Sequence, residues 1–248
     1  MDNLVANSIP PCGHDTHAAC SACSLSRLCL PLGLGRAELE RMDGIVTRSP
    51  VMHEGEHLFR VGDPFKSVHA IRSGSYKSYA VDSEGREHVL GFHLPGEIMG
   101  LEAIYSGRHM CDAVALDTAT VCVLPYTELA SLAGEIDGLR TQMFRLMSKD
   151  IADTAALAGD FTAEERTASF LMDLSRRFHE RGFSPVSFNL SMSRRDIANY
   201  LRLAPETVSR VFARFEKSRM IAVDRREIRL LDYAKLQELG RCMGEMVA

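Results

Sequence analysis

The sequence predicts an α+β protein with three parts in chain order: an N-terminal β-roll of the jelly-roll type, a long helix, and a C-terminal winged helix-turn-helix. Three observations lead to this prediction. Short alternating segments separated by glycine fill the region from residue 50 to 125. A stretch with helical periodicity and no proline follows, from residue 135 to 157. Two short amphipathic helices about a tight turn come near residue 200, and a candidate β-hairpin follows them.

The β-roll prediction depends on five segments of five or six residues each. They alternate apolar and polar side chains, and turn signals such as Gly62-Asp63-Pro64 and Pro95-Gly96 stand between them. Short strands at regular spacing are typical of barrels and jelly rolls. The five expected strands are Glu56–Val61, Ser67–Arg72, Tyr76–Val81, His88–Phe92 and Thr120–Leu124.

The long helix, expected from about Glu135 to Leu157, carries two apolar stripes. One has alternating spacings of four and three residues, which predict a heptad seam that packs against a second helix. The seam consists of Arg140, Phe144, Met147, Ile151, Thr154 and Ala158. Leu139, Met143 and Leu146 form the other stripe, which can pack on the β-roll. A single wide stripe facing one core gives the same periodicity, so the pattern leaves both interpretations open.

The C-terminal part has the pattern of a helix-turn-helix unit. Ser193 is a candidate N-cap for a helix over 194–202, and a second helix over 206–217 follows a three-residue break. A unit of this kind places its second helix in the major groove of DNA. The other elements expected here are an amphipathic helix over 163–178 and the two strands of a hairpin wing, 220–223 and 227–231.

Three polar residues share one face near the start of the second helix: Glu206, Ser209 and Arg210. Arginine can fork onto guanine, glutamate can accept a hydrogen bond from cytosine, and serine can bond a base edge or a phosphate. The alternative is an ordinary solvated helix start, where an acidic residue also suits the helix dipole. The surrounding motif favours DNA reading, so we predict that these three residues bind DNA.

The distribution of charge agrees with a DNA-binding module. The whole chain has a net charge of −4, which by itself argues weakly against a nucleic-acid partner. Residues 189–230, however, hold ten Lys and Arg against five Asp and Glu, whereas residues 1–188 hold 17 against 25. An acidic body with one basic module fits a protein that presents one face to phosphates.

Three cysteines stand close together near the N-terminus, Cys20, Cys23 and Cys29, and Cys122 lies in an expected strand about ninety residues later. Sites made only of thiolates select soft metals and iron–sulfur clusters. The N-terminal spacing alone does not separate these two, although zinc sites more often show two separated pairs of ligands.

The remaining cysteines have simpler interpretations. Cys111 and Cys242 are expected to be small apolar fillers. Cys12 is spaced with His14 and His17 so that the three could bind zinc, or it belongs to an arm without a metal. Seven cysteines without a secretion signal indicate a reducing, cytoplasmic compartment, and no apolar run is long enough to span a membrane.

These motifs together resemble the CRP/FNR superfamily of bacterial transcription regulators and, within it, the FNR/ANR oxygen sensors. The resemblance spans nearly the whole chain. The segments that carry it are Cys20-x2-Cys23-x5-Cys29 with Cys122, Ala70–Ser75, Gly91–Pro95, Arg145–Ser148, Leu174–Ser184 and Glu206–Arg210.

The resemblance implies a cofactor, partners and a switch. One oxygen-labile [4Fe–4S] cluster per subunit would be held by the three N-terminal cysteines and Cys122. Cluster binding would favour a homodimer, joined along the seam, on a two-fold operator resembling TTGAT-N4-ATCAA. Oxygen would degrade the cluster and release monomers. RNA polymerase is a further implied partner, with candidate surfaces at the hairpin 81–86 and near 181–183.

The expected domain organisation combines the patterns with the resemblance. It consists of a cysteine-rich cluster-binding arm over 1–30, a β-roll sensor domain over 31–134, a dimerisation helix over 135–160 and a winged helix-turn-helix DNA-binding domain over 161–248. Some relatives carry an acidic residue near the seam position of Thr154. The adjacent Asp153 is our hypothesis for the carboxylate that opposes dimerisation when the cluster is absent.

Three other functions fit parts of the pattern less well or remain open. A zinc-stabilised regulator without an oxygen switch could use the same four thiolates. A cluster-bearing oxidoreductase is disfavoured because the chain has no glycine-rich dinucleotide loop and no catalytic triad, so we expect no enzyme activity. Cyclic-nucleotide control is not expected either. Leu101 falls where the superfamily's cyclic-nucleotide sensors bind ribose with a glutamate, and Cys111 or Asp112 falls where they bind phosphate with an arginine.

Overall fold

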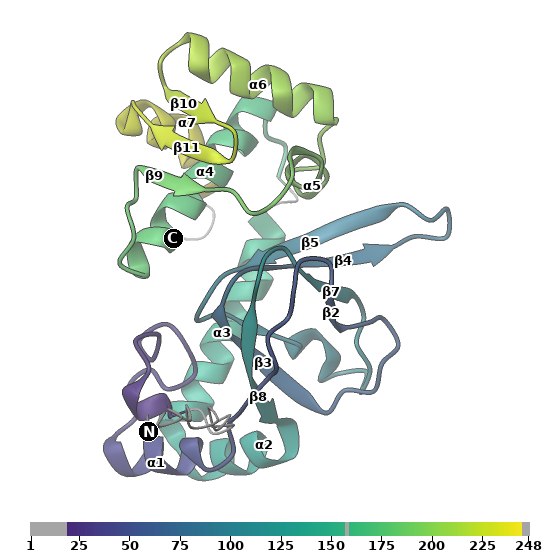
Figure 1. The fold of residues 1–248 in the computed structure, drawn as a ribbon, viewed down its shortest axis with the longest axis vertical. Helices are drawn as coiled ribbons and strands as arrows, with labels where there is room; N and C mark the ends of the chain where they lie inside the picture. Colours follow the sequence, from purple (N-terminus) through teal and green to yellow (C-terminus); the bar gives the residue numbers. More distant parts are fainter. Residues whose placement is uncertain (1–18, 157–158, 245–248) are drawn as a thin grey trace, which may run out of the picture.

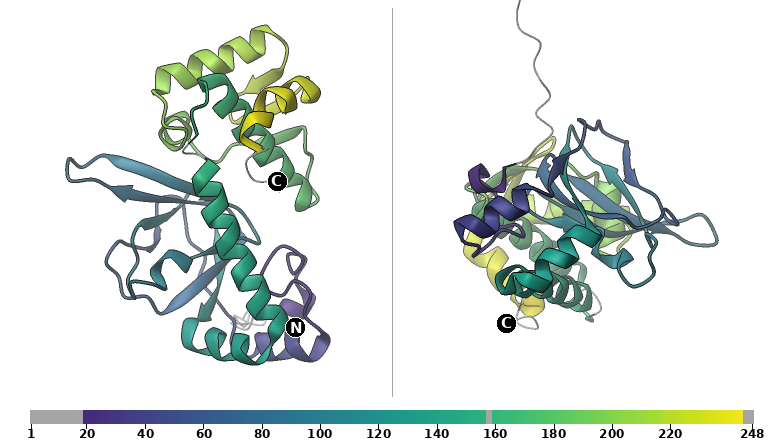
Figure 2. Two further views of the ribbon diagram at one scale, coloured as in Figure 1. Left: turned by 180° about the vertical axis from the view of Figure 1, so that it is seen from behind. Right: turned by 90° about the horizontal axis from the view of Figure 1, so that it is seen from below.

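The computed structural model describes residues 19–156 and 159–244. A β-domain and a C-terminal helical domain lie at opposite ends of the molecule, and helix α3 (Asp137–Ala156) runs along the β-domain toward the C-terminal one (Figures 1 and 2). The N-terminal segment lies beside the start of α3 (Figure 1). The predicted α+β fold is confirmed: a β-domain, a long helix and a helix-turn-helix follow one another along the chain.

The β-domain consists of two antiparallel four-stranded sheets, with strand orders β1-β8-β3-β6 and β2-β7-β4-β5. The five expected strands are confirmed as β2 to β5 and β8, with ends shifted by up to two residues. The pattern does not predict β1, β6 and β7, because two of them have only two residues and all four residues of β7 are buried, so none alternates visibly. The strands are β1 (Thr47–Arg48), β2 (His57–Phe59), β3 (Ser67–Ser73), β4 (Tyr76–Val81), β5 (Glu87–His93), β6 (Ile98–Met99), β7 (Asp112–Ala115) and β8 (Thr120–Pro125).

Four short helical segments accompany the strands within residues 19–135. They are the 3-10 turns η1 (Cys20–Ala22) and η2 (Leu101–Ala103) and the helices α1 (Arg36–Asp43) and α2 (Tyr126–Glu135). The long helix expected from about Glu135 begins at Asp137 instead. Ile136 separates it from α2, since this residue is extended (φ −112°, ψ 100°) and its side chain is buried in the core.

Helix α3 has two different faces. Leu139 is fully buried, and Met143 and Leu146 pack against the core between the N-terminal segment and the β-domain. Phe144 and Ile151 of the predicted seam are 64% and 71% exposed. The seam therefore does not face the protein's own core, which favours two separate stripes over one wide stripe. Ala158, the last predicted seam residue, lies outside the described residues.

The C-terminal domain has the predicted helix-turn-helix with a hairpin beside it. Its elements are α4 (Ala163–Glu180), β9 (Ser187–Asn189), α5 (Arg194–Tyr200), α6 (Pro205–Lys217), β10 (Ile221–Asp224), β11 (Glu227–Leu230) and α7 (Tyr233–Gly244). The hairpin β10–β11 pairs with β9 in a three-stranded antiparallel sheet. The expected helices and hairpin strands are confirmed, and β9 and α7 are additional.

One hydrophobic cluster spans the boundary between the two domains. Phe92 and Leu94, from the end of β5, are buried in the same cluster as residues of α4 and α6. The ring of Phe92 lies 6.0 Å from that of Phe170 and 5.2 Å from that of Tyr200. Within residues 19–156 and 159–244, no helix is both long and apolar enough to cross a membrane.

Candidate functional site

Helix α6 presents the predicted reading residues to solvent. Pro205 occupies its first turn, where the missing N–H costs nothing, and the helix buries one apolar face. Glu206, Ser209 and Arg210 are all exposed. The Ser209 hydroxyl donates to the Pro205 carbonyl at 2.9 Å, and Nε of Arg210 reaches the Glu206 carbonyl at 3.3 Å. Within residues 19–156 and 159–244, the hydrogen bonds of Ser209 and Arg210 go to their own helix, so these side chains are free to turn toward a partner.

Helix α5 packs against the buried face of α6. Its N-cap Ser193 accepts a hydrogen bond from the Asp196 amide, and the Asp196 carboxylate bonds back to Ser193, which forms a capping box. Ile197 is fully buried beneath α6. The Arg194 guanidinium lies 3.9 Å from the centre of the Phe212 ring. This stacking ties the start of α5 to the middle of α6.

The cysteines Cys20, Cys23, Cys29 and Cys122 line a single pocket. Cys20 lies on η1, which Asp43 holds: this carboxylate accepts hydrogen bonds from the Cys20 amide and, at 2.9 Å, from the Ser21 hydroxyl. Cys122 lies on β8, between β1 and β3. The rest of the pocket wall is mainly apolar and includes Leu30, Val46, Ala70 and Leu124.

The sulfur-rich, apolar character of this pocket fits a soft metal or an iron–sulfur cluster. In the part of the chain that the structure describes, however, no three His, Cys, Asp or Glu side chains stand close enough to hold a metal ion. The four thiols therefore share one cavity without converging on one point. Binding would require small movements of the N-terminal loop, which carries three of them.

Three of the four thiols lie where burial disfavours the thiolate form. Burial raises the pKa of Cys20 to about 12, and the Asp43 carboxylate adds to this rise. Burial also raises the pKa of Cys29 to about 12. It raises that of Cys122 too, although the charge of Arg72 acts in the opposite direction. Thiols in such a pocket become ligands when a soft cation displaces their protons.

Two further contacts join the cysteine loop to α3 and to the turn after β5. The side-chain amide of Gln142, on α3, donates to the Cys29 carbonyl at 3.4 Å, and its oxygen is buried without a hydrogen-bond partner in the described structure. Gly96 has a left-handed φ of +91°, and a β-carbon there would lie 2.9 Å from that of Leu28. The loop therefore touches both the long helix and the turn after β5.

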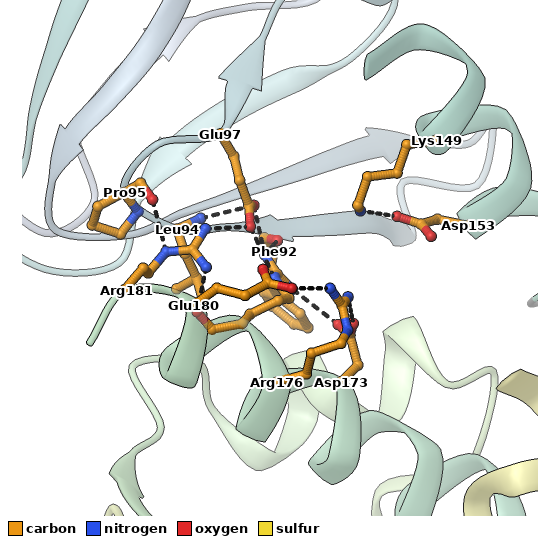
Figure 3. Close-up of polar contacts among 11 residues, drawn as sticks. Phe92, Leu94, Pro95, Glu97, Lys149, Asp153, Asp173, Arg176, Glu180 and Arg181 are labelled. Atoms are coloured by element: carbon orange, nitrogen blue, oxygen red, sulfur yellow. Dashed lines mark hydrogen bonds and ion pairs between the residues drawn. The ribbon is translucent and has the colours of Figure 1, made fainter. Parts of the chain in front are cut away.

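The same turn holds the DNA-reading domain through Glu97 (Figure 3). Arg177 and Arg181, both on or next to α4, each donate through Nη2 to the Glu97 carboxylate at 2.6 Å. Nε of Arg181 also donates to the Pro95 carbonyl at 2.7 Å. We call Glu97, Arg177 and Arg181 the interdomain clasp. It connects the turn beside the cysteine loop with the first helix of the C-terminal domain.

The sequence analysis did not identify Gln142 or Glu97. Cys111 is buried in the β-domain core, as a small apolar filler would be. Asp112 is buried at the start of β7. The group Cys12, His14 and His17 lies outside the described residues, so the zinc interpretation of that group stays a prediction.

Comparisons with known proteins cover both domains. Residues 51–135 match the cyclic nucleotide-binding domain family, and residues 165–239 match the Crp-like helix-turn-helix domain family. The chain is 46% identical over 224 residues to the "Fumarate and nitrate reduction regulatory protein" of Escherichia coli K12, which covers 89% of this chain and 90% of that protein.

A second relative and a solved structure agree. The "Transcriptional activator protein Anr" of Pseudomonas protegens is 46% identical over 226 residues, 90% of this chain and 93% of that protein. The structure of FixK2 from Bradyrhizobium japonicum superimposes with a TM-score of 0.71 at 29% identity, over 79% of this chain and 97% of that one.

Proposed function

Because the chain belongs to the FNR/Anr family of the CRP/FNR superfamily of transcription regulators, we propose that it senses oxygen through a [4Fe–4S] cluster that controls homodimerisation and operator binding. Family membership makes it a DNA-binding transcription regulator and not an enzyme. The cofactor, the dimer, the operator and the cytoplasmic location are parts of the proposal.

One observation carries the proposal: four cysteines from distant parts of the chain line one apolar pocket. Cys20, Cys23, Cys29 and Cys122 would hold the cluster, one per subunit. When bound, a cluster of this kind supplies sensitivity to oxygen. The chain's own contribution is to gather the loop that carries Cys20, Cys23 and Cys29 against β8, and to exclude water with the apolar wall.

The position of the cysteine loop bears on two other parts of the molecule, helix α3 and the interdomain clasp. Gln142 connects Cys29 to α3, the helix that carries the seam. Leu28 packs on Gly96, next to the interdomain clasp. A loop held in place by ligated cysteines therefore supports both the proposed dimer surface and the position of the DNA-reading domain.

The proposed homodimer forms along the exposed seam of α3. Phe144 and Ile151 leave large apolar surfaces in solvent on one side of that helix, and such surfaces usually mark an interaction site. Thr154, also exposed, is small. A seam that mixes large and small residues gives a marginal dimer, and a coupling free energy of about 1–3 kcal/mol is enough to switch it.

The dimer would read a two-fold operator similar to TTGAT-N4-ATCAA. In a two-fold complex each subunit inserts its α6 into one half-site, so that Glu206, Ser209 and Arg210 face base edges. RNA polymerase would meet the hairpin 81–86 or the region around Phe183, which is exposed. Cyclic nucleotides are not proposed as ligands, because the buried Asp112 would repel a phosphate.

The test is anaerobic purification followed by assays for iron, acid-labile sulfide and zinc, with the visible spectrum recorded during exposure to air. We expect about four irons and four sulfides per chain and a brown colour that bleaches in air. Cys122→Ser should abolish the colour. Cys111→Ser, which changes a buried thiol outside the pocket, should keep it. A colourless protein that contains zinc and binds DNA equally well in air would refute the oxygen switch and favour the zinc-stabilised alternative.

A further inference from the structure

Three residues other than glycine have a left-handed backbone conformation within residues 19–156 and 159–244: Arg202, Arg219 and Arg225. All three are arginines of the DNA-binding domain, with φ between 54° and 57°. Glycine is the usual residue in this conformation, because a β-carbon crowds the neighbouring carbonyl. Strain of this kind is often kept at functional positions.

The surrounding hydrogen bonds fix Arg202 in this conformation. It follows the last residues of α5, and its N–H donates to the Asn199 carbonyl at 3.0 Å. The next N–H, of Leu203, donates to the Ala198 carbonyl at 2.9 Å. This pair of bonds is the Schellman motif, whose left-handed position is most often glycine. Arg202 therefore holds a position where its side chain brings a conformational cost.

Arg219 occupies the equivalent position at the end of α6. Its N–H donates to the Glu216 carbonyl at 2.9 Å, and the N–H of Met220 donates to the Phe215 carbonyl at 2.8 Å. The two helices of the helix-turn-helix thus end in the same motif with the same residue. Their surroundings differ: Arg202 precedes the reading end of α6, whereas Arg219 follows its other end. The 13 residues of α6 separate them by about 20 Å.

The residues next to Arg202 in this turn have apolar side chains. Residues 201–205 read Leu-Arg-Leu-Ala-Pro, and of these five Arg202 alone has a polar side chain. The N-cap Ala204 makes no side-chain capping bond, and Pro205 has no N–H to offer. Arg202 is exposed, and in the described part of the chain its guanidinium has no hydrogen bond or ion pair. The charge at this turn is thus available to an outside partner.

In a complex of a helix-turn-helix with DNA, the sugar–phosphate backbone can be that partner. The second helix enters the major groove by its N-terminal end while the first helix crosses the sugar–phosphate backbone. The turn between them accordingly lies at the border of the groove. Arg202 stands four residues before Glu206, at this border. We propose that Arg202 contacts a DNA phosphate and positions α6 in the groove.

The proposal is independent of the cluster and concerns only how the domain grips DNA. A phosphate contact adds affinity for every sequence and makes binding more sensitive to salt, with a slope of about 0.9 for each phosphate neutralised. At 0.15 M salt this slope corresponds to about fivefold in affinity per contact, and to about 30-fold when two subunits bind one operator. Specificity between operator and random DNA should not change.

Three variants of the full chain test this inference: Arg202→Gly, Arg202→Gln and Arg219→Gly. Anaerobically purified protein is titrated onto labelled operator and random duplexes by fluorescence anisotropy at several salt concentrations. Both Arg202 variants should lose about 30-fold in affinity for operator at 0.15 M salt, and their salt slopes should fall by about 1.8. Arg219→Gly removes the same charge from the same backbone motif and should bind within about twofold of the parent, since it lies far from the groove.

Thermal unfolding distinguishes the effect of losing the charge from the effect of changing the backbone conformation. Arg202→Gly relieves the left-handed strain, so its unfolding midpoint should stay at or above that of the parent, while Arg202→Gln keeps the strain. Weaker DNA binding by a variant that is at least as stable cannot come from misfolding. Unchanged salt slopes for both Arg202 variants would overturn the inference. An equal loss in Arg219→Gly would also overturn it, because general loss of charge would then explain the result.

Discussion

The interdomain clasp gives the most quantitative prediction. Glu97 faces two guanidinium groups, and the side chain of Arg181 is only 3% exposed while that of Glu97 is 27% exposed. Burial by itself raises the pKa of Glu97, but the charges and hydrogen bonds of Arg177 and Arg181 outweigh it and lower the pKa from 4.5 to about 2. Each pKa unit corresponds to about 1.4 kcal/mol, so the clasp contributes up to about 3 kcal/mol to folding at neutral pH.

Replacing Glu97 by Gln removes the charge and leaves the two arginines facing each other. We expect Glu97→Gln to lower the free energy of unfolding at pH 7 by about 3 kcal/mol, measured by urea denaturation of the cluster-free protein. Glu84→Gln is the matched control. Glu84 pairs with Arg86 at 3.0 Å, but both side chains are about two-thirds exposed, so this change should cost less than about 1 kcal/mol.

The pH dependence gives a second readout of the same clasp. The folded pKa of Glu97 lies below its unfolded value, so the stabilisation is complete above about pH 4.5 and is lost as the pH falls toward 2. The difference between the parent and Glu97→Gln should therefore shrink by about 1.4 kcal/mol between pH 7 and pH 3.5. A difference that stays constant over this range, or a Glu97→Gln cost no larger than that of Glu84→Gln, would refute the reasoning.

Three further predictions concern the DNA-reading unit and the dimer. Ser193→Ala removes the N-cap of α5 and should cost about 1 kcal/mol in urea denaturation; an unchanged midpoint would show that the capping box is unimportant. Ile151→Glu places a charge on the exposed seam and should leave the anaerobic protein monomeric in sedimentation with unchanged circular dichroism, whereas a persistent dimer would argue against the seam. Asp153→Ala should strengthen dimerisation of the cluster-free protein by up to about fivefold in the association constant, measured by sedimentation. The gain is limited because Lys149 already pairs with Asp153. An unchanged monomer fraction would show that Asp153 does not oppose dimerisation.

Sequence reasoning succeeded where the signal is local. Helix α5 begins with the Ser193 cap, and α6 begins with Pro205 and buries Val208 and Phe212 one turn apart, so both could be located from spacing alone. The heptad pattern of α3 was compatible with two separate stripes and with one wide stripe, so periodicity alone did not identify an exposed face. The burial of Leu139 and the exposure of Ile151 decide that question.

The elements that were missed depend on distant partners. Ile136 separates α2 from α3 because its side chain is buried in the tertiary core; the turn signal Asp137-Gly138 stands beside it, but the expected helix was begun near Glu135 without using that signal. Glu97 meets Arg177 and Arg181 across 80 or more residues, and Gln142 meets the Cys29 carbonyl across 113. Gln142 does carry a weak signal, since it is a polar residue between Leu139 and Leu146 on the side of the helix that faces the core.

The four cysteines also combine a local sequence signal with a contact that only the fold creates. The spacing of the three N-terminal ones indicates a soft-metal site, but only the fold brings Cys122 on β8 to the same pocket. No local pattern in a strand distinguishes a ligand cysteine from a buried filler such as Cys111. The family resemblance supplied the fourth residue, and the shared pocket supports it.

The central claim is that the occupied cysteine pocket controls dimerisation and DNA binding. It is tested most directly by sedimentation of the anaerobic protein with operator DNA, before and after exposure to air. We expect a complex of one dimer with one operator before exposure, and free DNA with monomeric protein afterwards. A complex of the same mass and affinity under both conditions would contradict it.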